Sequence, residues 1–332
     1  MTRYDAKDWD AAVAALRDAD AVTIACHVNP DGDALGSLFG ASLGLRTLDK
    51  KTFPTWGATP PELPPGYEFL PGADSLVHPE EIPDNPVFLA LDCGAVDRLG
   101  DHLLDAARTA PTTINVDHHP GNDEFGDLNI VVPTASSTSE LVFGLLKDLD
   151  IAIDRDIATN LYTGLFTDTG SFQYANSTPD TLRLAADLLE YGVPKTEIAQ
   201  HVFETAPYGY IRLLARVLSN AQLLEEERFI YSVITHEDLR ESDVIMEETD
   251  KVIDVLRSTR DADVAAIFKE QGDGKFRASL RSKGNVSVGA IARARGGGGH
   301  ELAAGFTTDD IKATVQEIVE ELKAGKWTAS SR

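Results

Sequence analysis

The sequence has few cysteines and no long apolar run. Its two cysteines, Cys26 and Cys93, each lie inside an apolar stretch and form no CxxC pair, so neither a disulfide framework nor a zinc ribbon is indicated. No stretch approaches about 18 uninterrupted apolar residues, and the first residues lack the basic start and apolar run of a secretory signal. These absences predict a soluble protein of the cytoplasm without a membrane partner.

Positive charge is also scarce. The chain has 30 Lys and Arg residues against 54 Asp and Glu residues, which gives a formal net charge of −24. Such a surface repels a polyanion, which argues against a protein that grips long duplex nucleic acid by electrostatics. Small anions held in one local site are compatible with this charge, and solubility alone is an alternative explanation of the acidity.

The length of 332 residues predicts two domains, since a domain usually has about 100–200 residues. Continuous apolar runs at 21–27, 87–94 and 112–119 end abruptly in polar residues, which is typical of buried parallel strands. We therefore expect an α/β fold whose N-terminal domain has a mostly parallel sheet flanked by helices.

Helices are expected beside these strands. Apolar residues at helical spacing after Asp33 predict a helix that follows the first strand. Ser136 or Ser137 is expected to cap another helix, with Glu140 three residues after Ser137 as in a capping box. A further helical run ends near Asp168.

The expected boundaries place the first domain at residues 1–192 and a helical connector at 193–225. Beyond 226 the pattern changes: FIYSVIT, DVAAIFKE and KFRASLRS are expected strands, with Gly-Asp-Gly at 272–274 as a hairpin turn between the last two. A smaller α+β domain is therefore expected at 226–328.

Asp and His side chains recur where these strands and helices end. Asp-Gly-Asp alone is commonly a turn, but here it joins other such groups at the carboxyl ends of expected strands, where open α/β sheets bind ligands. Clustered carboxylates repel each other and are costly to desolvate, so divalent cations are the simplest way to bring them together. Carboxylates with a minority of imidazoles suit manganese or magnesium, and the expected chemistry is phosphoryl hydrolysis by metal-bound hydroxide, with two ions about 4 Å apart. The Asp and His side chains that we expect to gather in this site are His27, Asp31, Asp33, Asp92, His118, His119 and Asp168.

Four ordered motifs, HVNPDGDALGS, LDCG, NVDHH and FTDTGSF, resemble those of the DHH phosphoesterase family. The resemblance implies two divalent metal ions, with Mn²⁺ preferred and Mg²⁺ possible. It also implies that His119 lies beside the substrate phosphate, that Asp117 orients the neighbouring imidazoles, and that Asp92, His118 and His119 form the catalytic set. The implied ligands are His27, Asp31 and Asp92 for one ion and Asp33, Asp92, His118 and Asp168 for the other, with Asp92 bridging.

Some of these residues have structural alternatives. His118 and His119 can be polar residues at a strand end, and Asp117 can be purely structural. Arg98, just after LDCG, is either a surface charge or a contact to a phosphate.

Residues 275–300 form a basic region without a single Asp or Glu, whereas the acid content of the whole chain predicts about four. Ordinary surface cations on an exposed strand and helix are the alternative. The region ends in a run of four glycines and a histidine, where backbone amides can approach an anion closely. GGGGHELAAGF and SLRSKGNVSVGAIAR resemble the C-terminal domain associated with one DHH subfamily. The resemblance implies a substrate-binding domain that acts through Arg281, Ser282, Gly298, Gly299 and His300.

The pair of domains narrows the resemblance to the nano-RNase subfamily. It implies hydrolysis of short oligoribonucleotides to 5′-mononucleotides and of 3′-phosphoadenosine 5′-phosphate to AMP. Small nucleotides and short single-stranded RNA are the implied partners, and a homodimer is an expected assembly.

Three alternatives are a phosphodiesterase for cyclic or linear dinucleotides such as c-di-AMP, a RecJ-like single-strand exonuclease and a non-enzymatic nucleotide sensor. A dinucleotide-binding oxidoreductase is disfavoured because HVNPDGD stands where GxGxxG is needed.

Overall fold

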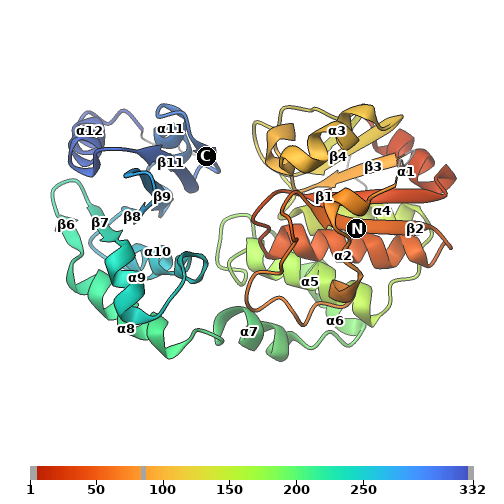
Figure 1. The fold of residues 1–332 in the computed structure, drawn as a ribbon, viewed down its shortest axis with the longest axis horizontal. Helices are drawn as coiled ribbons and strands as arrows, with labels where there is room; N and C mark the ends of the chain where they lie inside the picture. The colour runs from red at the N-terminus through yellow and green to blue at the C-terminus, as the bar shows by residue number, and fades with distance from the viewer. Residues whose placement is uncertain (1–5, 84–86, 328–332) are drawn as a thin grey trace. The chain divides into compact units, whose positions relative to one another are not determined.

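The computed structural model describes residues 6–83 and 87–327, and the chain divides into two compact units (Figure 1). Unit 1 is Met1–Thr205 and unit 2 is Ala206–Arg332. In the described part of the chain, no helix has the length and apolar character that crossing a bilayer requires.

Unit 1 contains a parallel sheet of five strands in the order β2-β1-β3-β4-β5. Almost every residue of β1, β3 and β4 is buried, which explains their continuous apolar sequences. The expected parallel sheet is confirmed. Its strands are β1 (Ala21–Cys26), β2 (Lys51–Trp56), β3 (Val87–Leu91), β4 (Thr112–Asp117) and β5 (Leu128–Val131).

Helices cover both faces of this sheet, as Figure 1 shows. Alternate strand residues point to opposite faces, so Ile24 and Leu89 pack into the larger core with α2, α4 and α5, whereas Ala25 and Phe88 pack against α3. The helices of unit 1 are α1 (Trp9–Asp18), α2 (Gly32–Arg46), α3 (Asp101–Thr109), α4 (Thr138–Asp148), α5 (Arg155–Asp168), α6 (Pro179–Glu190) and α7 (Lys195–Phe203), with 3-10 turns at Ala73–Ser75, Pro79–Glu81 and Val96–Leu99.

Helices α2 and α5 pack closely because α2 carries a glycine at every fourth position. A methyl group added at Gly32 would meet the Thr167 side chain, and one at Gly40 would meet Leu161, both on α5. Small residues at this spacing let two helix backbones approach each other. The close packing brings the first turn of α2 near the last turn of α5.

We expect Gly36→Ala to lower the free energy of unfolding by about 1–3 kcal/mol, the usual cost of overpacking a core. The added Cβ would lie 2.8 Å from the backbone nitrogen of Gly164, and backbone cannot move aside as a flexible side chain does. This clash exceeds the gain of roughly 1 kcal/mol in helix propensity. Urea unfolding would measure the change, and Gly272→Ala, where the new methyl group meets nothing within 4 Å, is the control. Equal stability of the two variants would contradict the expectation.

Unit 2 contains a mixed sheet of six strands in the order β10-β11-β9-β8-β7-β6, with β7 and β8 parallel and the other pairs antiparallel. The expected hairpin joins β8 and β9 through residues 272–274, where Gly274 has a positive φ of 80°. The strands are β6 (Gln222–Leu224), β7 (Phe229–Ile234), β8 (Val264–Glu270), β9 (Phe276–Ser282), β10 (Gly298–Gly299) and β11 (Ala303–Thr308).

Two apolar cores lie on the faces of the unit 2 sheet. Ile230 and Ala265 pack with α8 and α10 on one face, whereas Phe268 and Leu280 pack with α11 and α12 on the other. The helices are α8 (Tyr208–Ser219), α9 (His236–Ser242), α10 (Val252–Arg257), α11 (Val288–Arg293) and α12 (Ile311–Lys323), with a 3-10 turn at Met246–Thr249. The smaller α+β domain is therefore present.

The segment expected as a helical connector, 193–225, contains α7 in unit 1 and α8 in unit 2, but it also includes strand β6 of the unit 2 sheet. The domain boundaries given by the sequence stay a prediction.

Candidate active site

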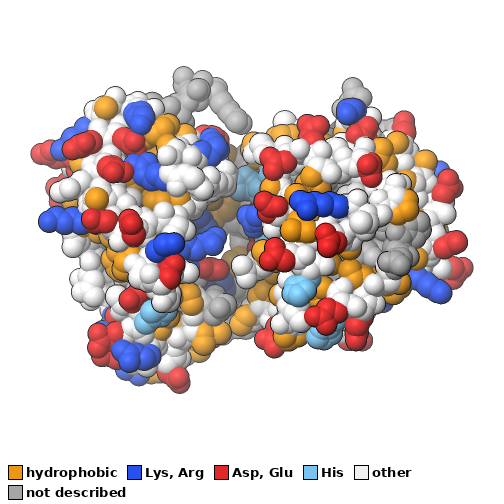
Figure 2. Space-filling view, turned by 45° about the horizontal axis from the view of Figure 1, so that its top comes forward, with side chains coloured by type: hydrophobic (Ala, Val, Ile, Leu, Met, Phe, Trp, Pro, Cys, Tyr) orange, Lys and Arg blue, Asp and Glu red, His pale blue; other side chains and the backbone are white. Residues whose placement is uncertain are grey.

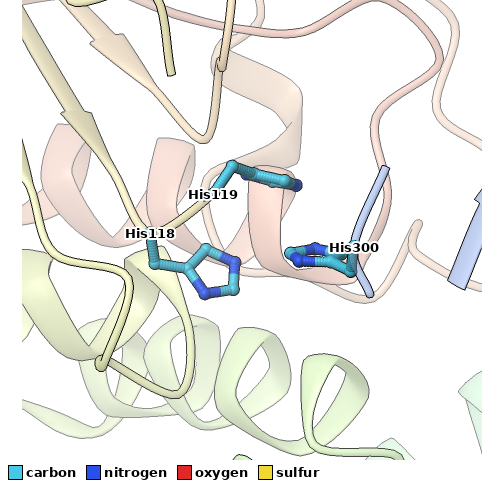
Figure 3. Close-up of side chains that lie close together, drawn as sticks. All are labelled: His118, His119 and His300. Carbon is cyan, nitrogen blue, oxygen red and sulfur yellow. The ribbon is translucent and has the colours of Figure 1, made fainter. Parts of the chain in front are cut away.

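The candidate site of unit 1 lies at the carboxyl ends of three neighbouring strands. His27 follows β1, Asp92 follows β3, and Asp117 ends β4 just before His118 and His119. Because β1, β3 and β4 are adjacent and parallel, their ends meet at one edge of the sheet. Figure 3 shows the two histidine rings on the loop that follows β4; the third ring that it labels, His300, belongs to unit 2.

One group of side chains surrounds His118. Its Nε2 lies 3.6 Å from Asp168 Oδ2, 3.8 Å from Asp92 Oδ1 and 3.9 Å from Asp33 Oδ2. Asp33 comes from the first turn of α2 and Asp168 from the last residue of α5. Except for Asp168, whose side chain is 22% exposed, these groups are buried. Three carboxylates and one imidazole thus converge from four segments.

A second group of side chains surrounds Oδ2 of Asp92, whereas Oδ1 belongs to the group around His118. Asp92 Oδ2 lies 3.6 Å from His27 Nε2, and the ligand atoms of His27, Asp31 and Asp92 lie within 4.8 Å of one another. Asp31 is exposed and also caps α2, since its Oδ1 accepts hydrogen bonds from the backbone nitrogens of Asp33 and Ala34. Asp92 therefore presents one oxygen to each group.

Asp117 holds the two histidines of its own motif. Its Oδ1 accepts hydrogen bonds from the backbone nitrogen of His118 at 2.8 Å and from His119 Nδ1 at 2.7 Å. Its Oδ2 accepts one from Asn122 Nδ2 at 2.6 Å. Asn122 also donates to the Cys93 carbonyl, so it links the ends of β3 and β4. Asn122 was not predicted from the sequence as a site residue, although its place five residues after Asp117 in the same loop is a local signal.

Burial and mutual repulsion oppose ionisation of two of these carboxylates, Asp33 and Asp168. Burial raises the pKa of Asp33 well above its usual range, and the charges of Asp92 and Asp168 raise it further. Burial likewise raises the pKa of Asp168 to about 7, with Asp31 and Asp92 adding to the rise. A divalent cation beside these carboxylates would offset their repulsion, so such an ion is a favourable partner for them.

The histidines favour the ionised form of Asp92. Burial disfavours its charge, but the contact with His27 and the charges of His119 and His118 outweigh burial and lower the pKa of Asp92. Burial also opposes the charged form of His119, yet the hydrogen bond to Asp117 and the charge of Asp92 raise its pKa to about 10. The Asp92 carboxylate, which lies between the two groups, therefore stays in the ionised form that binds cations.

Arg98 lies in the 3-10 turn that follows β3. Its carbonyl accepts a hydrogen bond from the backbone nitrogen of Val28 at 2.8 Å, and its side chain is exposed. Burial opposes the charged form of His27, but the contact with Asp92 and the charge of Asp31 raise its pKa, and the positive charge of Arg98 partly opposes that rise.

Unit 2 carries the other residues that the sequence singled out. Arg281, on β9, is 30% exposed and has its Nε 3.8 Å from Asp254 Oδ1. Ser282 is fully buried, and its hydroxyl accepts a hydrogen bond from the backbone nitrogen of Gly284. Gly298 and Gly299 form β10, and half-buried His300 follows directly. Substrate contact by these residues stays a prediction.

Comparison with known families identifies both halves of the chain. The N-terminal domain of the DHH family matches residues 21–165, and the DHHA1 domain matches residues 226–325. The bifunctional oligoribonuclease and PAP phosphatase NrnA of Thermus thermophilus is 33% identical over 305 residues, which cover 91% of this chain and 89% of that protein. The chain belongs to the DHH phosphoesterase family. This DHH phosphoesterase is thus a metal-dependent hydrolase of phosphate esters, and its clustered carboxylates and imidazoles suit that chemistry.

Other relatives match this DHH phosphoesterase over nearly its full length. The cyclic-di-AMP phosphodiesterase GdpP of Geobacillus thermodenitrificans is 27% identical over 93% of this chain and 47% of its own length. The crystal structure of an exopolyphosphatase-related protein from Bacteroides fragilis has a TM-score of 0.87 and 27% identity, with 98% of each chain covered.

Proposed function

We propose that this DHH phosphoesterase hydrolyses short oligoribonucleotides to 5′-mononucleotides and 3′-phosphoadenosine 5′-phosphate to AMP, with two divalent ions of which Mn²⁺ is preferred over Mg²⁺. The observation that carries the proposal is the division of Asp92 between two groups of ligands, with Oδ2 at 3.6 Å from His27 and Oδ1 at 3.8 Å from His118. The relative named as an oligoribonuclease and PAP phosphatase supports the choice of substrates.

Two sets of side chains would hold the ions. His27, Asp31 and Asp92 would bind one, and Asp33, Asp92, His118 and Asp168 the other. Divalent ions at these positions supply charge that stabilises phosphate oxygens and lower the pKa of a water molecule.

The chain's own residues would orient the substrate. His119 is 30% exposed, compared with 5% for His118, which makes it the more accessible of the two imidazoles. Asp117 fixes the His119 ring through Nδ1, so the opposite edge of the ring would face a phosphate oxygen. Exposed Arg98 would add a second cation on the same side of the sheet.

Unit 2 would bind the nucleotide. Figure 2 shows Lys and Arg side chains among the acidic ones on the visible face of this unit, although the whole chain is strongly acidic. Arg281 and His300 are the proposed anchors, because both are partly accessible and each can donate to a phosphate. The backbone amides of Gly298 and Gly299, on β10, would add donors. Ser282, next to Arg281 on β9, would support that strand.

A second candidate is hydrolysis of cyclic or linear dinucleotides, which the similarity to a cyclic-di-AMP phosphodiesterase favours. The same metal-binding side chains would serve both reactions, so the two candidates differ only in the substrate. We further propose that the protein acts in the cytoplasm. We also propose that it forms a homodimer, and sedimentation velocity would test this assembly.

We expect the highest kcat/KM on RNAs of a few nucleotides and on 3′-phosphoadenosine 5′-phosphate. Each added phosphate must lie against a chain of net charge −24, which weakens the binding of longer strands. The test is a parallel assay with Mn²⁺ on diadenylate, an RNA ladder, 3′-phosphoadenosine 5′-phosphate and c-di-AMP. Fastest turnover of c-di-AMP would favour the second candidate. Efficient degradation of duplex DNA or long structured RNA would contradict both.

A further inference from the structure

Five consecutive residues that lead into α4 and form its first positions, residues 135–139, are buried to at least 97%. The sequence, Ala-Ser-Ser-Thr-Ser, predicts a helix cap, and the structure confirms one: the Ser137 hydroxyl accepts a hydrogen bond from the backbone nitrogen of Glu140. Capping needs one or two of these residues and not the burial of all five. Other polar groups of this segment bond to side chains of the candidate site and to Asn176.

The first two backbone N–H groups of α4 bind Asp33. Thr138 N donates to Asp33 Oδ2 at 2.6 Å, and Ser139 N donates to Asp33 Oδ1 at 2.9 Å. These are donors that a helix cannot satisfy within itself, so a carboxylate is a favourable partner. Both carboxylate oxygens of Asp33 therefore accept hydrogen bonds from the backbone of α4.

Thr138 also contacts the carboxylate that lies between the two groups of ligands. Its hydroxyl donates to Asp92 Oδ1 at 3.0 Å, the oxygen that faces His118. One fully buried residue therefore holds Asp33 through its backbone and Asp92 through its side chain.

The other members of this group are also tied to the segment. The Ala135 carbonyl lies 3.3 Å from His118 Nδ1. The Ser136 carbonyl accepts a hydrogen bond from Asn176 Nδ2, which also lies 3.3 Å from Asp168 Oδ2. The segment thus contacts three of the four side chains directly and reaches Asp168 through Asn176.

We propose that Thr138 is a positioning residue whose hydroxyl fixes the Asp92 carboxylate relative to Asp33 for ion binding, a role that rests on the proposed two-metal function. Asp33, Asp92 and Asp168 repel one another, and fixed donors oppose the rotation that would separate their oxygens. Hydrogen-bond partners of metal ligands typically change metal affinity by about 10- to 100-fold when they are removed.

The test compares Thr138→Val, which keeps the shape and the backbone N–H but removes the hydroxyl, with Thr138→Ser, which keeps the hydroxyl. Calorimetry would measure Mn²⁺ affinity after metal removal, and thermal unfolding would measure Tm without metal. We expect Thr138→Val to weaken Mn²⁺ binding by about 10- to 100-fold and Thr138→Ser to bind within about threefold of wild type. If the valine variant does not fold, Thr138→Ala takes its place with the same expectation.

The matched control is Thr113→Val on β4, which removes another buried hydroxyl, one that donates to the Ala107 carbonyl. It should lower Tm without changing Mn²⁺ affinity, as a purely structural hydroxyl would. Wild-type affinity in Thr138→Val, or equal losses in the valine and serine variants, would overturn the proposal.

Asp92→Asn distinguishes this failure from failure of the two-metal function. If Asp92→Asn binds Mn²⁺ as tightly as wild type does, the proposed function is wrong. If Asp92→Asn loses affinity and Thr138→Val does not, only the role of Thr138 is wrong.

Discussion

Asp92→Asn is expected to lower turnover by more than about 100-fold on every substrate, even with saturating Mn²⁺. The reason is geometric, since one carboxylate oxygen faces His27 and the other faces His118. An amide is neutral and offers a single oxygen ligand, so it cannot serve both groups. Loss of a shared ligand should exceed the roughly 10- to 100-fold effect of removing a hydrogen-bond partner of a ligand.

The measurement is kcat on diadenylate and on 3′-phosphoadenosine 5′-phosphate over a range of Mn²⁺ concentrations. The fold should persist, because asparagine keeps the size and shape of the Asp92 side chain. Circular dichroism would check this. Asp180→Asn, which removes an exposed carboxylate paired with Arg183, is the control and should keep full activity. Near-normal turnover of Asp92→Asn would refute the bridging role.

Arg281→Ala and His300→Ala are each expected to lower kcat/KM on nucleotides by about 10- to 150-fold, which corresponds to roughly 1.5–3 kcal/mol for a lost charge-assisted hydrogen bond. Mn²⁺ affinity should match wild type, because neither residue belongs to the proposed ligand sets. The loss should be smaller on a minimal aryl phosphodiester, which has no nucleotide for unit 2 to bind.

Arg277→Ala is the control for this pair. Arg277 lies four residues before Arg281 on β9, and its removal changes the net charge by the same amount. A loss in Arg277→Ala as large as that in Arg281→Ala would indicate general electrostatic attraction and not a specific contact. Equal losses on the nucleotide and aryl substrates, or weakened Mn²⁺ binding, would contradict the proposed division of labour between the units.

The fold of unit 1 could be predicted because its signals are local. Three strands are buried on both faces, so their sequences are continuous apolar runs, and the polar residues that end those runs mark one edge of the sheet. The order of the motifs then identified the family, and with it the residues that would bind metal ions. In unit 2 the glycine-containing turn at 272–274 predicted the β8–β9 hairpin in the same way.

The order of the strands in the sheet could not be predicted from the sequence and was seen only in the tertiary structure. Strand β1 lies between β2 and β3, which puts His27 next to Asp92 and leaves β2 at the sheet edge. Apolar runs that are buried on both faces look alike, so their patterns do not say which strand pairs with which. The glycines that bring α2 onto α5, and with it Asp33 toward Asp168, likewise have a partner that the sequence does not name.

The sequence by itself singled out the side chains that are proposed to carry the chemistry, because each lies near the end of a strand or helix whose pattern is local. Only the tertiary structure decided what holds those side chains. Thr138 donates to Asp33 and Asp92, which lie 105 and 46 positions away in the chain. Threonine at the start of a helix is common for capping alone, so a residue that also orients two distant carboxylates has no distinguishing pattern around it. These hydrogen bonds form only when the start of α4 packs beside the end of β3 and the first turn of α2.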